Sequence, residues 1–258
     1  MLAAAIAGVV SRRASIKYDR VFYSGMAIAM ALTAFVGFGP SYYWKVFGDA
    51  PLTTIRGQPM TPVLHVHAAL FSAWVVLFVV QTTLVAQHKV AIHRRIGVAG
   101  ALLAAAMVPV AMLVALKGLG RGTNPVGLDP LSAVLLPLSN VVFFAAFVAT
   151  ALRMRRNREA HKRLMLLAYV SIIGAAVGRV AGALGRVAGV KLPALAIFGL
   201  SLGFVVIAIA YDAISRRRVH PVYIWGGAAL ILSLPLRVAL SRTEVWKSFV
   251  TTLARLVS

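Results

Sequence analysis

The chain contains no cysteine and few charged residues. Without thiols it cannot form disulfides, ligate iron–sulfur clusters or bind a metal through thiolates. Charged residues make up 13% of its 258 positions, far below the roughly 25% of a typical soluble domain. Hydrophobic residues make up 60%, and the mean hydropathy is +0.87. This composition predicts an integral membrane protein.

Motifs of common enzymes are also missing. The sequence has no phosphate-binding loop, no nucleophile elbow and no paired-carboxylate site. The last apolar segment, residues 222–240, contains no Lys, which argues against a retinal Schiff-base protein. The first stretch, MLAAAIAGVVSRR, has its arginines after the apolar run, whereas a signal peptide has basic residues before it.

Seven apolar stretches are long enough to cross a bilayer. About 20 apolar residues span the roughly 30 Å hydrocarbon core as a helix, and only a helix satisfies its own backbone polar groups there. We therefore expect an all-α polytopic membrane protein with seven transmembrane helices in one bundle, residues 21–240. A cytoplasmic or interfacial leader, 1–20, precedes it, and an outer C-terminal tail, 241–258, follows. The expected helices are 21–39, 63–86, 96–116, 131–152, 164–184, 193–214 and 222–240.

The distribution of Lys and Arg predicts the orientation. If the N-terminus is cytoplasmic and the C-terminus outside, sixteen of the 27 basic residues lie in inner segments, ten, Arg237 among them, lie in outer segments, and Arg179 lies inside a helix (16 + 10 + 1 = 27). This excess fits the positive-inside rule. The net charge of +21 then reflects topology and contact with anionic lipids, and no nucleic-acid partner is expected.

Histidines fall into two layers. His65 and His67 open the second predicted helix on the outer side, whereas His93, His161 and His220 each precede or open a helix on the inner side, where His88 also lies. The segment from His67 to Ala86 alone rises about 28 Å as a helix. His67 and His93 therefore cannot share one cofactor.

The inner histidines have a repeated context. HRRIG begins at His93, HKRLM begins at His161, and His220 follows three arginines. One interpretation is that imidazole and basic side chains mark the membrane interface. The other is that three helices each bring one imidazole to the same depth, as in the cofactor sites of helix bundles. Two would ligate haem b, and all three with a water would suit zinc.

The region from His65 to Arg179 resembles an uncharacterised family of bacterial multi-pass membrane proteins, a domain of unknown function. Its pattern is a His opening a helix, a Gln near that helix's end, a His-Arg-x-x-Gly start to the next helix, a later His-basic-x-Met and a distant Arg. The matching residues here are His65 or His67, Gln81, His93 with Arg94 and Gly97, His161 with Met165, and Arg179. The same rhythm is similar, more loosely, to b-type cytochromes that act as transmembrane ferric or ascorbate-linked reductases.

The cytochrome resemblance implies a haem-binding electron-transfer protein of the bacterial inner membrane, with a quinone or another redox partner. Those cytochromes hold two bis-His haems, one in each half of the membrane. Here His65 and His67 lie about 200° apart around their helix and cannot ligate one iron from both sides. An outer haem would need another ligand, such as Met60. We expect a single inner haem held by His93 and His161.

Arg179 is the most unusual residue by position. It lies about 22 Å into a roughly 30 Å core if its helix starts at Leu164, and no acidic residue is expected at that depth. A charge in the membrane marks a function or a partner by default. Arg179 either reaches outward to water or forms an outer pocket with His67 that faces a haem propionate, a quinone carbonyl or a lipid phosphate.

Three functions from different classes follow from these patterns. The first is a b-type haem protein that transfers electrons. The second is a zinc-dependent membrane hydrolase with His93, His161 and His220 as metal ligands. The third is a non-enzymatic assembly factor or accessory subunit of a larger membrane complex, which binds no cofactor and has only interfacial histidines.

Overall fold

The computed structural model describes residues 2–48, 51–53, 59–119, 129–190, 192 and 194–256. Its described part is helical apart from turns and one isolated bridge between Thr53 and Pro59. Seven helices are long and apolar enough to cross a membrane, which confirms the all-α polytopic fold. They cover Tyr18–Val46, Pro62–Ala86, Val90–Lys117, Pro130–Arg153, Arg158–Val187, Ala196–Arg216 and Pro221–Ser241, each within several residues of its predicted range.

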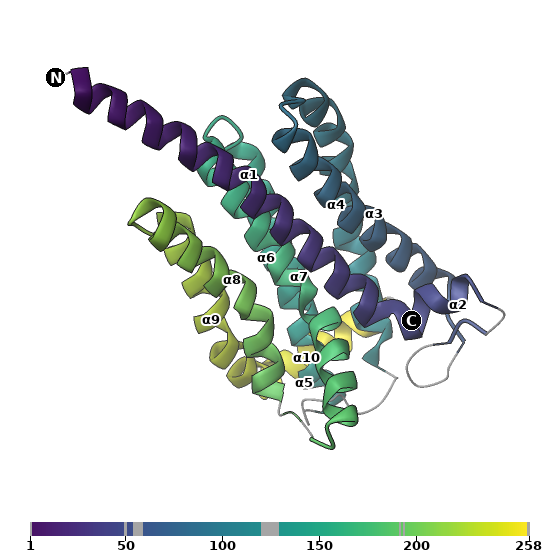
Figure 1. Cartoon of the computed structure of the whole chain (residues 1–258). Helices are drawn as coiled ribbons and strands as arrows, with labels where there is room; N and C mark the ends of the chain where they lie inside the picture. Colours follow the sequence, from purple (N-terminus) through teal and green to yellow (C-terminus); the bar gives the residue numbers. More distant parts are fainter. Residues whose placement is uncertain are drawn as a thin grey trace.

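Figure 1 shows the described elements in chain order. They are α1 (Leu2–Phe38), the π-helical turn η1 (Gly39–Tyr43), α2 (Trp44–Val46), α3 (Pro62–Ala86), α4 (Val90–Lys117), α5 (Pro130–Ala133), α6 (Leu135–Arg153), α7 (Arg158–Val187), α8 (Ala194–Arg216), α9 (Pro221–Ser241) and α10 (Glu244–Arg255).

Several helix starts can be traced to local sequence. Pro62, Pro130 and Pro221 stand in the first turns of α3, α5 and α9, where a missing backbone N–H costs nothing. Asn157 caps α7 by accepting from the Ala160 N–H at 3.1 Å. The side chain of Asp129 caps α5 through the Ser132 N–H at 3.0 Å, and these hydrogen bonds lower the pKa of Asp129.

The two segments that flank the predicted bundle are both helical. The expected leader, 1–20, continues without a break into α1, which begins at Leu2. The expected tail contains α10, whose Trp246 belongs to a buried cluster with Leu116, Leu135 and Val250. The indole N–H of Trp246 also donates to the Leu131 carbonyl at 2.8 Å. The tail is therefore docked on the bundle.

Five of the long helices form a closed ring. α1 packs on α3, α3 on α4, α4 on α6, α6 on α7, and α7 returns to α1. α8 and α9 pack on the outer side of α7, and α10 crosses one end of the bundle (Figure 1). We call the end with the connections 87–89, 154–157 and 217–220 the basic end, and the other the opposite end.

Aromatic side chains fill the interior of the ring. Trp74 of α3 meets Phe144 of α6 edge to face, with ring centroids 5.0 Å apart. Phe78, one turn further along α3, meets Tyr169 of α7 in the same way at 5.0 Å. These four residues are at least nine-tenths buried. Because such pairs have preferred geometries, they fix the rotation of α3 relative to α6 and α7.

A glycine sets the close approach of α1 to α7. A Cβ atom on Gly37 would lie 2.6 Å from the Ala176 carbonyl oxygen, whereas a Cβ on Gly25 of the same helix meets nothing within 4 Å. We expect Gly37→Ala to lower the free energy of unfolding by about 1–3 kcal/mol, as overpacking does. Gly25→Ala should be neutral or stabilising by up to about 1 kcal/mol. Denaturant titration of both variants in detergent checks this, and equal stabilities would contradict the close approach.

Candidate functional site

Two of the predicted histidines meet at the basic end. His93 lies in the first turn of α4 and His161 in the first turn of α7. Their ring centroids are 6.5 Å apart, and the ring planes are nearly perpendicular, at 86°. α4 and α7 are not consecutive neighbours in the ring, so this pair reaches across its interior. Both rings are partly buried.

The Nδ1 atom of each histidine in this pair has a protein partner. His161 Nδ1 lies 2.8 Å from the Ala151 carbonyl oxygen near the end of α6. A carbonyl only accepts, so Nδ1 of His161 carries the proton and its Nε2 has a free lone pair. This is the arrangement of most metal-bound histidines, in which the other ring nitrogen donates to a protein oxygen.

Gln81 fixes the position of the second ring. Its amide nitrogen donates to the His93 carbonyl at 3.2 Å and reaches His93 Nδ1 at 2.5 Å, while its oxygen accepts from the Gly97 N–H at 3.0 Å. In this orientation Nδ1 accepts, so the proton is on Nε2. Ligation through His93 Nε2 would require the reversed amide, whose oxygen accepts from Nδ1–H but also faces the His93 carbonyl.

His220 does not belong to this pair. Its Nδ1 caps α9 by accepting from the Val222 N–H at 3.2 Å, and its backbone N–H donates to Asp212 at 3.2 Å. Burial, reinforced by the nearby Arg163 guanidinium, lowers the pKa of His220, so its ring is neutral at physiological pH. Within the described residues, no three His, Asp or Glu side chains lie close enough to share a metal ion. The three-histidine zinc site stays a prediction.

A buried arginine beside the histidines is the strongest electrostatic feature of the basic end. The Arg163 side chain is 0% exposed, and so is that of Asp212 on α8. Nε and Nη2 of Arg163 donate to the two Asp212 oxygens at 2.9 and 2.5 Å, in the bidentate geometry of strong pairs. Its Nη1 donates to Glu159 Oε2 at 2.7 Å. One guanidinium therefore joins α7 to α8.

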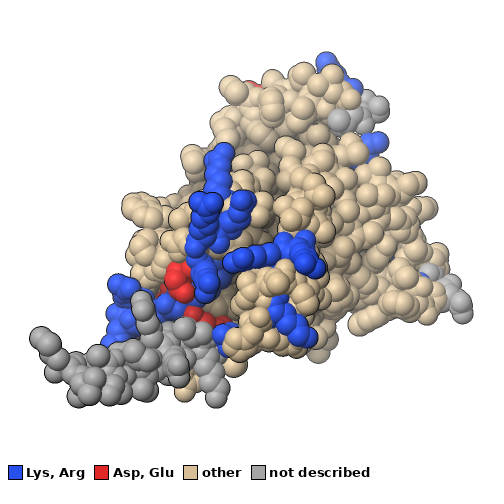
Figure 2. Space-filling model, turned by 90° about the horizontal axis from the view of Figure 1, so that it is seen from above, with Lys and Arg blue, Asp and Glu red and all other residues tan. Residues whose placement is uncertain are grey.

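A second cluster extends this network to α1. Asp19 accepts from Lys162 at 2.6 Å, from Arg216 at 2.5 Å and from the Tyr211 hydroxyl at 2.8 Å. Arg216 also pairs with Glu159 at 3.0 Å. Three carboxylates thus face three cations. Figure 2, which shows this end from above, has basic side chains gathered beside an acidic patch.

We call Asp19, Glu159, Lys162, Arg163, Asp212 and Arg216 the ion-pair network. Its three basic members are among the cations that the sequence analysis counted in the inner segments. The spacing of Glu159 and Arg163, four residues apart on a helix, could have indicated a local pair. The pairing of Arg163 with Asp212, 49 residues away, has no such local signal.

At the opposite end, His65 and His67 face different neighbours. His65 lies against the Tyr42 ring, with centroids 6.0 Å apart, and His67 stacks on Phe71 at 4.1 Å. This agrees with their expected positions on different faces of α3.

Arg179 lies at the same end, with its guanidinium carbon 4.2 Å from the Phe38 ring centroid. His67 and Arg179 interact electrostatically. Arg179 donates through Nη1 to the Ala175 carbonyl at 2.9 Å. Its buried Nε and the buried Nδ1 of His67 have no hydrogen-bond partner in the described part of the chain. The structure therefore brings these two predicted residues into one partly satisfied polar region.

Further buried polar atoms lie in the ring interior. The indole nitrogen of Trp74 and the hydroxyl of Tyr169 also have no partner among the described residues. Such atoms usually bind water or a ligand, because an unsatisfied buried group costs about 1–3 kcal/mol. The interior of the ring is thus largely apolar but contains polar atoms without hydrogen-bond partners among the described residues.

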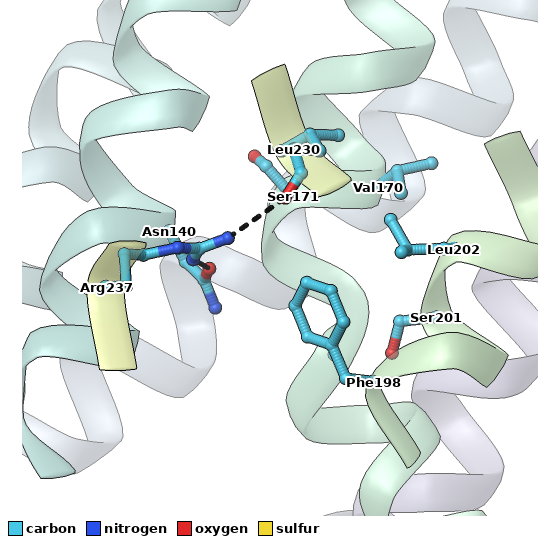
Figure 3. A pocket seen from close by; sticks show the side chains of 9 residues that line it. Asn140, Val170, Ser171, Phe198, Ser201, Leu202, Leu230 and Arg237 are labelled. Carbon is cyan, nitrogen blue, oxygen red and sulfur yellow. Dashed lines mark hydrogen bonds between the residues drawn. The ribbon is translucent and has the colours of Figure 1, made fainter. Parts of the chain in front are cut away.

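The sequence patterns did not predict that Arg237 is buried. The charge count placed it in an outer segment, and this placement is wrong, because Arg237 lies within α9 and is 5% exposed. Figure 3 shows its guanidinium extending between α6 and α9 toward Asn140 and the Leu230 carbonyl. A run of apolar residues on both sides of one Arg was the available signal.

Comparison of the chain with protein-family models, with curated proteins and with solved structures finds no match. The resemblances described from the sequence therefore remain predictions. The function has to be argued from the geometry of the molecule itself.

Proposed function

We propose that this multi-pass membrane protein binds one b-type haem between His93 and His161 and transfers electrons. The observation that carries the proposal is the facing pair of rings with centroids 6.5 Å apart. Imidazole nitrogens bind metals at about 2 Å, so two rings on opposite sides of one iron have centroids about 6 Å apart. The two imidazoles therefore fit a bis-His iron in type, number and separation. A bound haem would supply one-electron exchange.

The neighbouring residues support the same assignment. The Ala151 carbonyl holds the His161 ring with Nε2 free, and the Gln81 amide nitrogen lies 2.5 Å from His93 Nδ1 in the orientation that satisfies its neighbours. In the reversed orientation the Gln81 oxygen would accept the Nδ1 proton, which raises the basicity of a ligating His93 Nε2. Gln81 is then a positioning residue for the iron ligand.

We further propose that the basic end faces the cytoplasm of a bacterial inner membrane, in contact with anionic lipids. The excess of Lys and Arg in the segments at this end supports this orientation. A quinone or a protein redox partner would exchange electrons with the haem. The free donors of His67 and Arg179 at the opposite end are groups that could bind a quinone carbonyl.

Absorption spectroscopy of the whole chain tests the proposal. The protein is expressed with ample haem supply, purified in mild detergent and measured oxidised and dithionite-reduced, with haem and metal content per chain. We expect a Soret band, a sharp α band on reduction and about one haem per chain. Absence of these bands in folded, monodisperse protein overturns the proposal. Stoichiometric zinc would then favour the hydrolase, and cofactor-free co-purification with a larger complex would favour the accessory subunit.

A further inference from the structure

A small cavity lies between α6, α7, α8 and α9, away from the histidine pair. Its volume is about 40 Å³. It is lined by Asn140, Val170, Ser171, Gly174, Phe198, Ser201, Leu202, Leu230 and Arg237. Figure 3 shows Arg237 and Asn140 on one side, the Phe198 ring opposite them, and Ser171 and Ser201 from α7 and α8 further along the wall. Polar groups from four helices thus line one small, partly open cavity.

Every hydrogen-bond partner of Arg237 among the described residues is neutral. Its Nη1 donates to Asn140 Oδ1 at 2.8 Å and to Ser139 Oγ at 3.1 Å, and its Nη2 donates to Ser233 Oγ at 2.9 Å. Longer contacts of 3.4 Å reach the carbonyls of Leu230 and Ser233. No carboxylate among the described residues forms an ion pair with Arg237.

These contacts satisfy the N–H groups of Arg237, and its guanidinium carbon lies 5.3 and 5.7 Å from the Phe143 and Phe198 ring centroids, but none of these groups carries a negative charge. Arg163, the other deeply buried arginine, has two carboxylates within 3 Å. A cation buried in an apolar segment is costly unless a counter-charge lies beside it. The difference between the two arginines points to an anion that the chain itself does not provide.

The wall of the cavity can hold such an anion. Asn140 uses its oxygen for Arg237, so its amide N–H groups remain as donors. The Ser201 hydroxyl makes only a long contact, 3.3 Å, to the Ile197 carbonyl and can rotate toward the cavity.

Size selects the kind of anion. A water-sized body needs roughly 10–15 Å³ of such space, so a cavity of about 40 Å³ holds one monatomic ion with at most a few waters. A lipid phosphate with its glycerol is too large. We propose that this cavity binds a single chloride-sized anion, with Arg237 as counter-charge and the Asn140 amide and Ser201 hydroxyl as donors. This site shares no residue with the proposed haem site.

Thermal unfolding of the detergent-purified full chain tests the site. Sodium chloride replaces sodium gluconate stepwise at constant ionic strength, and bromide replaces chloride in a parallel series. We expect the unfolding midpoint of the wild type to rise with chloride and bromide and then to saturate, because an ion that binds only the folded state stabilises it. A midpoint that is the same in chloride and gluconate overturns the proposal.

Substitutions then locate the ion. Arg237→Met should abolish the halide response, whereas Arg242→Met, which removes an exposed charge five residues further on, should keep it. Gly174→Ala tests the space itself, since the added Cβ lies 3.6 Å from Ser201 Oγ, an ordinary contact that the fold tolerates. It keeps Arg237 but fills part of the cavity.

Gly174→Ala tests the proposed anion site even if Arg237→Met does not fold. We expect Gly174→Ala to unfold at or above the wild-type midpoint in gluconate and to lose most of the halide response. A halide response of wild-type size in folded Gly174→Ala would place the anion elsewhere and overturn the proposal. Neither result depends on whether the protein binds haem.

Discussion

Replacing Arg163 with Met is expected to lower the free energy of unfolding by about 3–5 kcal/mol, the effect of breaking a buried ion pair from one side. The substitution removes the guanidinium that binds Asp212 in bidentate geometry. Asp212 is 0% exposed, so its carboxylate would stay in the low-dielectric interior with Arg216, at 3.7 Å, as its remaining ion-pair partner among the described residues. Asp212→Leu should be similarly harmful because it leaves Arg163 buried.

The double variant distinguishes the loss of the ion pair from the cost of leaving one buried charge without its partner. Arg163→Met with Asp212→Leu removes both buried charges, so we expect it to be more stable than either single variant. Glu244→Gln in the exposed pair with Lys247 is the control, with an expected effect below about 1 kcal/mol. Denaturant titrations in one detergent measure all four. A loss below about 1 kcal/mol for Arg163→Met would contradict a structural role of the pair.

The membrane architecture was predictable because its signal is local. Each apolar run carries its own length and hydropathy, and a helix satisfies its backbone wherever it lies in the membrane. The docking of Trp246 on α5 was not predictable in the same way. It depends on which surface of a distant helix lies beside the tail, and no pattern within residues 241–258 specifies that surface.

The site was predictable only where one sequence pattern positions one residue. His93 and His161 occur in repeated motifs at two helix starts, and the structure places their rings together. Arg163 shares the same motif as His161, but its partner Asp212 comes from another helix. Basic residues at a membrane boundary have two physical explanations, topology and ion pairing, and only the packing of α7 against α8 distinguishes them.

The same limit explains Arg237. Near the end of a predicted span, an arginine can reach the interface or face the bundle, and the sequence does not decide between them. Its burial depends on the rotation of α9, which brings it to Asn140 of α6. Long-range packing therefore determines the burial and the partners of both deeply buried arginines of the described chain, Arg163 and Arg237.

Replacing either His93 or His161 with Ala is expected to remove the sharp low-spin α band and to lower the haem content of the purified protein. Each variant leaves only one imidazole at the site, and a bis-His haem loses its low-spin spectrum when one ligand is removed. His88→Ala and His220→Ala are the controls, because His88 contacts Arg20 and His220 caps α9. Both controls should retain the haem bands of the wild type.

His161→Met distinguishes ligation from a structural role. A thioether can replace one imidazole on iron, and Met/His ligation raises the reduction potential. We therefore expect this variant to keep more haem than His161→Ala and to show a higher midpoint potential in a redox titration. If His161 only held α7 against α6 through the Ala151 carbonyl, Met and Ala would behave alike. Wild-type spectra in folded His93→Ala and His161→Ala would place any bound haem elsewhere.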